Sequence, residues 1–281
     1  MFEARSSAEE GAPALPGLGL RTLVMGVVNV TPDSFSDGGQ FESCAAARDH
    51  ALLLEREGAD IIDVGGESTR PGYAAISAEE EQARVIPAIK AIARHVTVPI
   101  SIDTYKASTA RRALEAGARI VNDIWGLQRE PDIASVAAAG GAPVVIMHNR
   151  ESADPSLDIL DEMRRFFDRS LAIARRAGIP DRHIVLDPGI GFGKTADQHL
   201  DALRRLPELK ELGFPVLVGI SRKSVLGRIS PRATAPRDRL FGSIGAHVLA
   251  ATLGADIVRV HDVAPHLEAL RVVDATVKGH R

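Results

Sequence analysis

The chain has 281 residues, of which 45% are hydrophobic and 25% charged, so it is too apolar for a disordered protein and long enough for one large domain or two small ones. Its net charge of −3 argues against a general nucleic-acid or anionic-membrane binder, and its single cysteine excludes an internal disulfide framework and fits a reducing cytoplasm. Aromatic residues make up only 4%, which favours the aliphatic core of a parallel α/β fold.

The first part of the chain, residues 1 to about 20, is rich in Ala, Gly, Pro and Ser, and we expect it to form a flexible tail. It lacks the apolar stretch that a signal peptide needs. The rest of the chain has no uninterrupted apolar run of about 18 residues, the length that predicts a membrane span. We therefore expect a cytoplasmic protein with neither a membrane nor a nucleic acid as its partner.

Beyond this tail, short aliphatic runs alternate with longer helical stretches. The eight runs, each predicted to be a strand, are Leu23–Val28, Ile61–Val64, Val98–Ile102, Ile120–Val121, Val144–Met147, Ile184–Leu186, Val216–Ile220 and Ile257–Val260. The clearest helical patterns are Cys44–Glu57, Ala78–Arg94, Lys106–Ala116, Leu157–Ala177 and Ala264–Val277. Eight β-then-α units in about 250 residues are typical of an α/β fold with one (β/α)8 TIM-barrel domain, here residues 21–281. A doubly wound open sheet is the alternative, although no GxGxxG follows the first strand.

The active site of a TIM barrel lies at the carboxyl ends of its strands, so the residues after each run are the candidates. These residues are Asn29, Gly65–Arg70, Asp103, Asn122-Asp123, His148-Asn149, Asp187, Ser221–Lys223 and Arg259–Asp262. A single Asp or Asn at such a place can simply cap a helix. The concentration of polar and charged groups after all eight runs nevertheless indicates an active site at this end of the barrel.

Four of these residues suit a flat heterocycle with amino and carbonyl edges. Asp103, Asn122 and Asp187 offer carboxylates and an amide, and Lys223 can donate to a ring nitrogen or oxygen. The sequence therefore predicts a pocket for a ring.

A second group suits an anion. Arg70, Arg259 and His261 all donate hydrogen bonds, and the closure of the barrel would bring them together as a clamp for phosphate. Asn29, beside them, could ligate a hard cation such as Mg²⁺. We expect this diphosphate pocket to be separate from the ring pocket, so that Arg259→Ala would weaken binding of the anion and spare binding of the ring.

Two loops and one histidine need separate interpretation. The first loop, Asn29 to Gln40, is long for a β–α connector and is typical of a mobile lid. The stretch Gly189–Thr195 is similar to a phosphate loop, but it has three residues rather than four between its Gly and the Gly-Lys pair. We interpret its glycines as allowing sharp turns and close approach to a ligand. No zinc-ligand spacing of histidines occurs, and His247 is interpreted as a packing residue.

The chain resembles the dihydropteroate synthase family from about Arg21 onward. The stretches that carry the resemblance are Met25–Gly39, Asp63–Gly72, Ser101–Lys106, Val121–Ile124, Leu186–Thr195, Gly219–Ser224 and Arg259–Val263. The resemblance implies a TIM-barrel transferase that joins 6-hydroxymethyl-7,8-dihydropterin diphosphate to p-aminobenzoate and releases pyrophosphate and 7,8-dihydropteroate in folate synthesis. It also implies a homodimer, and inhibition by sulfonamides, which mimic p-aminobenzoate.

The resemblance also implies roles for individual residues. Implied pterin contacts are Asp103, Asn122, Met147, Asp187, Phe192 and Lys223; implied diphosphate contacts are Asn29, Thr69, Arg70, Arg259 and His261; implied p-aminobenzoate contacts are Phe35, Pro71, Lys223 and Ser224. The implied metal ligands are Asn29 and Asp37, which would hold Mg²⁺, and the implied catalytic residues are Asp37, Arg70, Lys223, Arg259 and His261. Trp125 and Asn149-Arg150 depart from the commonest family pattern.

The implied chemistry starts with departure of pyrophosphate, whose developing negative charge Mg²⁺ and the donors of the clamp would stabilise. The arylamine is a weak nucleophile, so we expect an SN1-like course through a cationic methylene group conjugated to the dihydropterin. A covalent protein nucleophile is not needed.

Two other functions stay open. A pterin-binding methyltransferase module of the same superfamily would need no diphosphate site, and the first loop and Ser221–Ser224 argue against it. A pterin-binding paralogue without turnover would usually have a damaged first or second loop, and both sequences are intact here.

Overall fold

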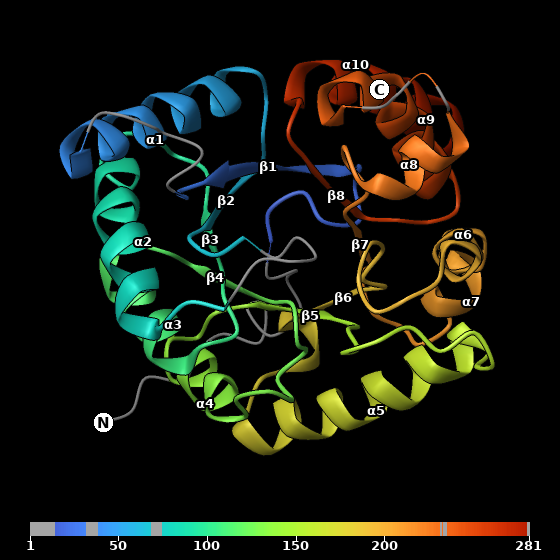
Figure 1. The fold of residues 1–281 in the computed structure, drawn as a ribbon, viewed down its shortest axis with the longest axis horizontal. Helices are drawn as coiled ribbons and strands as arrows, with labels where there is room; N and C mark the ends of the chain where they lie inside the picture. The colour runs from blue at the N-terminus through green and yellow to red at the C-terminus, as the bar shows by residue number, and fades with distance from the viewer. Residues whose placement is uncertain (1–14, 32–38, 69–74, 231, 233–234, 280–281) are drawn as a thin grey trace.

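The computed structural model describes residues 15–31, 39–68, 75–230, 232 and 235–279. Eight parallel strands lie at its centre: β1 (Leu23–Asn29), β2 (Ile61–Gly65), β3 (Ile100–Asp103), β4 (Ile120–Asp123), β5 (Val144–Met147), β6 (Ile184–Asp187), β7 (Leu217–Val218) and β8 (Ile257–Val260). Their order is β6-β5-β4-β3-β2-β1-β8-β7, and a parallel bridge between Leu186 and Val216 joins the two edges (Figure 1). The predicted TIM barrel is therefore confirmed.

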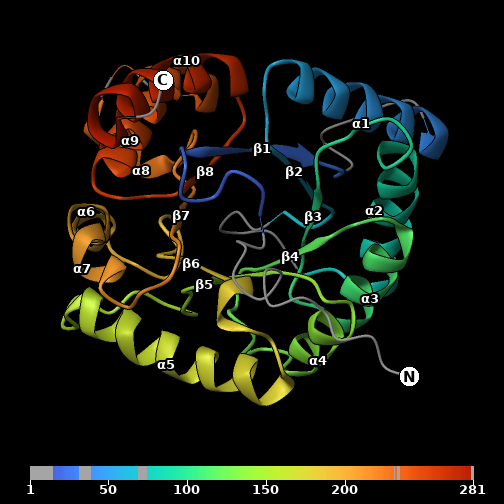
Figure 2. The same ribbon diagram turned by 180° about the vertical axis from the view of Figure 1, so that it is seen from behind.

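Helices form a ring around the strands, as both views show (Figures 1 and 2). They are α1 (Gly39–Arg56), α2 (Ala78–Ile92), α3 (Ala107–Ala116), α4 (Asp132–Ala139), α5 (Ile159–Ala177), α6 (Ala196–Arg204), α7 (Leu206–Lys210), α8 (Ser224–Ile229), α9 (Leu240–Thr252) and α10 (Val263–Val273). Helix α5 shows why these segments begin and end where they do. Asp158 caps the amides of its first turn, and Gly178 ends it in the left-handed conformation that glycine adopts easily. None of the helices in the described ranges is long and apolar enough to cross a membrane.

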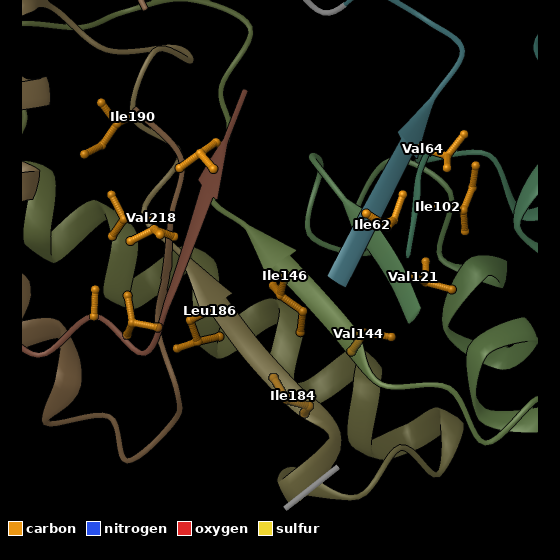
Figure 3. Packing of buried hydrophobic residues seen from close by; sticks show 14 of the residues in the cluster. Ile62, Val64, Ile102, Val121, Val144, Ile146, Ile184, Leu186, Ile190 and Val218 are labelled. Atoms are coloured by element: carbon orange, nitrogen blue, oxygen red, sulfur yellow. The ribbon is translucent and has the colours of Figure 1, made fainter. Parts of the chain in front are cut away.

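Strand side chains alternate between two cores, because successive residues of a strand point to opposite sides. The side chains that pack outward against the helices include Ile62, Val64, Ile102, Val121, Val144, Ile146, Ile184, Leu186 and Val218 (Figure 3). The side chains that fill the barrel include Met25, Ile61, Ile120, Val145, Val185, Leu217 and Ile257. The residues two positions after Ile61, Ile120, Val185 and Ile257 are Asp63, Asn122, Asp187 and Arg259. The barrel interior therefore changes from an apolar layer to a polar layer toward the carboxyl ends of the strands.

The end of the expected flexible tail is packed. Leu15 and Leu18 are only 3% and 8% exposed and belong to the apolar layer inside the barrel. Arg21 binds both oxygens of the Asp60 carboxylate, and the amide of Thr22 donates to the carboxylate of Asp274 at 3.0 Å. The packed part of the chain thus includes Leu15, and the boundary expected at residue 20 lies too late.

Candidate active site

Five of the predicted site residues lie outside the residues that the structure describes: Phe35, Asp37, Thr69, Arg70 and Pro71. The others lie at or just after the carboxyl ends of strands, or in the loop after β6, and parallel strands bring all of these to one end of the barrel.

The predicted ring-binding residues are brought together by strand register. Asp103 lies opposite Asn122 in the β3–β4 pair, and Met147 lies opposite Asp187 in the β5–β6 pair. Asn122, Met147 and Asp187 are buried. Because Asn122 and Asp187 continue the inward-facing rows of their strands, their polar groups lie inside the barrel mouth.

Arg259 connects this ring-binding set with the predicted anion clamp. Its Nε donates to Asp63 Oδ2 at 2.7 Å, and its Nη2 donates to Asp103 Oδ2 at 2.7 Å. The side-chain amide of Asn122 donates to Asp63 Oδ2 at 3.3 Å. The two pockets, which we expected to be separate, therefore meet at the guanidinium of Arg259.

Asp63 is a site residue that the sequence analysis did not single out. Its side chain is 0% exposed, and its carboxylate holds both Arg259 and Asn122. The signal that could have identified it is an acid inside an aliphatic run, on the same face of the strand as Ile61. A buried carboxylate at such a place needs a cation or donors as partners.

Burial strongly shifts the pKa values of several ionisable groups in the site. Burial raises the pKa of Asp103 to about 7; the Arg259 guanidinium opposes this shift and the Asp63 carboxylate adds to it. Burial also raises the pKa of Asp187, against the opposing effect of Lys223. The carboxylates of Asp63 and Asp103 outweigh burial at Arg259 and raise its pKa. Asp103 therefore changes its protonation near neutral pH, and it can donate as well as accept a hydrogen bond.

Lys223 lies close to the loop that follows β6. Its ammonium donates to the carbonyl of Ile190 and lies 4.6 Å from the centre of the Phe192 ring. Burial lowers the pKa of Lys223 to about 8, and the nearby carboxylate of Asp187 opposes that shift. The structure thus brings Lys223, Phe192 and Asp187 together. Ser224, the residue after Lys223, begins helix α8 and is exposed.

Side-chain contacts link the loops after β7 and β8. Arg222 donates two hydrogen bonds to the Asp262 carboxylate, and the Nε–Oδ2 distance is 2.9 Å. The ring Nδ1 of His261 lies 3.0 Å from the hydroxyl of Ser221. Arg222 has a φ of 59°, in the left-handed region where a residue other than glycine is strained by about 1 kcal/mol or more. The ion pair between Arg222 and Asp262 helps to hold the backbone in this turn. That turn positions the next residue, Lys223.

Asn29 ends β1 beside Gly65 of β2. Among the described residues, its side-chain amide makes no hydrogen bond, and no group of three His, Cys, Asp or Glu side chains could hold a metal ion. A Mg²⁺ ion takes oxygen ligands and usually keeps several waters and phosphate oxygens. The uncommitted amide oxygen of Asn29 therefore fits such an ion as one protein ligand.

His247 is fully buried, and its Nε2 accepts a hydrogen bond from the amide of Ile220 at 3.3 Å, so its interpretation as a packing residue is confirmed.

The glycines after β6 approach protein atoms closely. A Cβ atom on Gly189 would lie 1.9 Å from the carbonyl oxygen of His148, and one on Gly193 would lie 2.5 Å from the carbonyl oxygen of Arg150. Contact with the loop after β5 therefore accounts for these two glycines.

Comparison with known proteins is consistent with this geometry. The family model described as "Pterin binding enzyme" matches residues 25–261. A dihydropteroate synthase from Synechocystis is 49% identical over 263 residues, which cover 92% of this chain and 91% of that protein. The corresponding enzyme from Escherichia coli K12 is 46% identical over 262 residues, covering 91% of this chain and 92% of that protein. The chain belongs to the dihydropteroate synthase family. It is thus an enzyme of that class, a transferase of alkyl or aryl groups.

Solved structures of the family have the same fold. Dihydropteroate synthase from Clostridium difficile, in the presence of pteroic acid, is 50% identical with a TM-score of 0.89, and the match covers 92% of this chain and 97% of that one. The Xanthomonas albilineans enzyme with 4-aminobenzoic acid is 46% identical with a TM-score of 0.87, covering 91% and 93%. The same enzyme in complex with 7,8-dihydropteroate is 44% identical with a TM-score of 0.84, covering 92% and 95%.

Proposed function

We propose that this chain condenses 6-hydroxymethyl-7,8-dihydropterin diphosphate with p-aminobenzoate, in an SN1-like reaction that needs Mg²⁺, and releases pyrophosphate and 7,8-dihydropteroate. The observation that carries the proposal is the polar layer in the barrel mouth, where Asp103, Asn122, Asp187 and Arg259 face inward above an apolar layer. The Xanthomonas albilineans relative holds 7,8-dihydropteroate, the product proposed here.

The ring pocket binds the pterin by hydrogen bonds to the edge of the ring and by side chains that pack against its face. The carboxylates of Asp103 and Asp187 and the amide of Asn122 pair with the ring's amino and N–H groups. Lys223 donates to a ring nitrogen or oxygen, and Met147 and Phe192 pack against the ring. Because Asp103 has a pKa near 7, its protonation can adjust to the edge that the pterin presents.

The leaving diphosphate is stabilised by donors at the neighbouring strand ends. His261 and Arg259 lie there, and Thr69 and Arg70 follow β2 in the sequence. Asn29 and Asp37 would hold Mg²⁺, which supplies positive charge beside the leaving oxygens. The donors lower the barrier because they are aimed at charge that develops in the transition state.

The acceptor p-aminobenzoate lies against Lys223 and Ser224, and the family resemblance implies Phe35 and Pro71 as its other contacts. Its carboxylate is directed to the first turn of α8, where Ser224 offers a hydroxyl. The amine attacks the methylene carbon once pyrophosphate has left. Asp103 and Asp187 favour positive charge on the pterin ring when they are ionised.

A pyrophosphate-release assay tests this proposal. We expect release from the pterin diphosphate in the presence of p-aminobenzoate and Mg²⁺, at a rate insensitive to the basicity of substituted anilines. A steep dependence on basicity would refute the SN1-like course and leave the overall reaction standing. No release at saturating substrates would refute the reaction itself. That result favours a pterin-binding paralogue, and methyl transfer from a reduced folate to a corrinoid favours the methyltransferase.

We also propose that the chain forms a homodimer and works in the cytoplasm. Large apolar side chains are exposed on the neighbouring helices α8, α9 and α10: Ile229, Phe241, Leu249 and Val272, with Phe241 84% exposed. Exposed large apolar side chains on neighbouring helices favour a protein partner, and a second copy is the partner that the family resemblance implies. Light scattering on a size-exclusion column measures the mass, and Phe241→Glu should shift it from a dimer to a monomer.

A further inference from the structure

Lys194 is a buried amine beside the active site that the proposed reaction does not use. The residue is only 7% exposed. Its Nζ lies 2.7 Å from Nδ1 of His148, and it donates to the carbonyl oxygens of Gly189 and Phe192 at 3.0 Å and 3.2 Å. Lys194 therefore ties both ends of the loop after β6 to the residue that follows β5.

The Gly189–Gly193 loop packs closely against its surroundings. Ile190 belongs to the same buried cluster as Leu186 and Val218 (Figure 3). The amide of Gly191 donates to Nδ1 of His199 at 3.1 Å, and a Cβ atom on Gly191 would lie 2.7 Å from the Lys223 side chain. A displacement of this loop would therefore displace the Lys223 side chain as well.

The same loop contains one of the predicted pterin-binding residues and contacts two others. It contains Phe192, its Ile190 carbonyl accepts from Lys223, and the amide of Gly189 donates to Asp187 Oδ1 at 2.7 Å. The Phe192 ring also lies beside the Lys223 ammonium. The position of the loop thus sets the positions of an aromatic face, a cation and a carboxylate together.

We propose that Lys194 is a positioning residue, which holds the Gly189–Gly193 loop against the end of β5 and so places Phe192 and Lys223 for the pterin. This inference rests on the proposed function, because it assumes that the pterin binds at these residues. An ammonium donates three hydrogen bonds, and Nδ1 of His148 and the carbonyl oxygens of Gly189 and Phe192 all lie within hydrogen-bond distance of Lys194 Nζ.

The electrostatics of the cluster agree with a dedicated role. Burial lowers the pKa of His148 to about 2, so its ring is neutral, and the tautomer that carries its proton on Nε2 lets Nδ1 accept from Lys194. Burial also lowers the pKa of Lys194 to about 7, although Asp187 opposes that shift. A buried amine is thus retained here at an electrostatic cost that a methionine would avoid.

The test compares Lys194→Met with Lys210→Met as a matched control. Lys210 pairs with Asp256 and lies in α7, away from the loop. Titration calorimetry measures binding of 6-hydroxymethylpterin and, separately, of inorganic pyrophosphate. We expect Lys194→Met to bind the pterin about tenfold more weakly, the usual effect of losing one charged hydrogen bond, and to bind pyrophosphate within about twofold of wild type. Lys210→Met should leave both affinities unchanged.

Hydrogen exchange of the Gly189–Gly193 amides gives a second readout that does not depend on any ligand. These amides should exchange faster in Lys194→Met and at the wild-type rate in Lys210→Met. Unchanged exchange or unchanged pterin affinity in a folded Lys194→Met protein would overturn the inference. So would an equal loss of pterin and pyrophosphate binding.

His148 supplies a second pair of variants in case Lys194→Met does not fold. His148→Asn keeps a side-chain acceptor and should bind the pterin more tightly than His148→Leu, which removes it; equal affinities would count against the inference. A wild-type protein that binds no pterin would instead refute the proposed function, and the exchange rates would still decide whether Lys194 holds the loop.

Discussion

Replacing Arg259 by alanine would leave two carboxylates in the barrel mouth without their cation. The guanidinium donates to both Asp63 and Asp103 at 2.7 Å, and the Asp63 side chain is fully buried. Removing one partner of a buried ion pair costs about 3–5 kcal/mol. The Arg259 side chain is 21% exposed, so we expect a cost near the lower end of this range. Arg259→Ala should lower the unfolding free energy by about 3 kcal/mol.

The loss should depend on pH with a definite sign. The pKa of Asp103 in the folded protein is about 7, above its ordinary 3.8, so the stability contributed by this group falls as the pH rises between these values. Arg259 opposes the upward shift. Without Arg259 the pKa of Asp103 rises further, so the stability that Asp103 contributes continues to fall up to a higher pH. The deficit of the variant should therefore be larger at about pH 8.5 than at about pH 5.5, by about 1.4 kcal/mol for each unit of additional pKa shift.

Urea denaturation of wild type and Arg259→Ala at both pH values measures this deficit. Arg175→Ala is the control, since Arg175 pairs with Asp181 at an exposed site and should contribute little to the unfolding free energy. Because Arg259 also contacts Asp103, free pterin should bind more weakly, along with pyrophosphate, and this replaces the expectation that pterin binding is spared. A deficit as small as that of Arg175→Ala and equal at both pH values would refute the reasoning.

Three further predictions concern other parts of the site. Asp123→Ala should lower the unfolding free energy by about 1–3 kcal/mol in urea denaturation, because the Asp123 carboxylate accepts from the amides of Trp125 and Leu127 at 2.7 Å; an unchanged midpoint would contradict this. Chelation with EDTA should abolish pyrophosphate release and added Mg²⁺ should restore it, whereas full turnover in EDTA would exclude a metal at Asn29. A sulfonamide should raise the KM for p-aminobenzoate at constant kcat in steady-state kinetics, and a fall in kcat alone would show that it binds elsewhere.

The barrel could be predicted from the sequence because its strands are buried on both faces and stand out as aliphatic runs. The ends of the runs were less well defined. Strand β3 begins at Ile100, after Pro99, which has no N–H for a ladder hydrogen bond. Strand β7 comprises only Leu217–Val218, although the aliphatic run extends over Val216–Ile220. Hydrophobicity reports burial, and Val216 and Ile220 are buried although they lie outside the strand.

The strand-end residues could also be predicted, because the fold dictates where they meet. The roles of Asp63 and Lys194 could not, since each depends on a contact between segments far apart in the chain. Asp63 and Arg259 are separated by 196 positions, and Lys194 and His148 by 46. Strand register and loop packing decide these contacts. The acid inside an aliphatic run marks Asp63 as unusual, but the local sequence does not identify its partner.

Mass-spectrometric detection of 7,8-dihydropteroate tests the central claim most directly. Wild-type protein is incubated with the pterin diphosphate, p-aminobenzoate and Mg²⁺, beside an Asp187→Asn variant and the Lys210→Met control. We expect wild type and Lys210→Met to form equal amounts of product and Asp187→Asn to form far less, because Asp187 lies in the inward-facing polar layer. Product at wild-type levels from Asp187→Asn, or none from wild type, would contradict the assignment of catalysis to this end of the barrel.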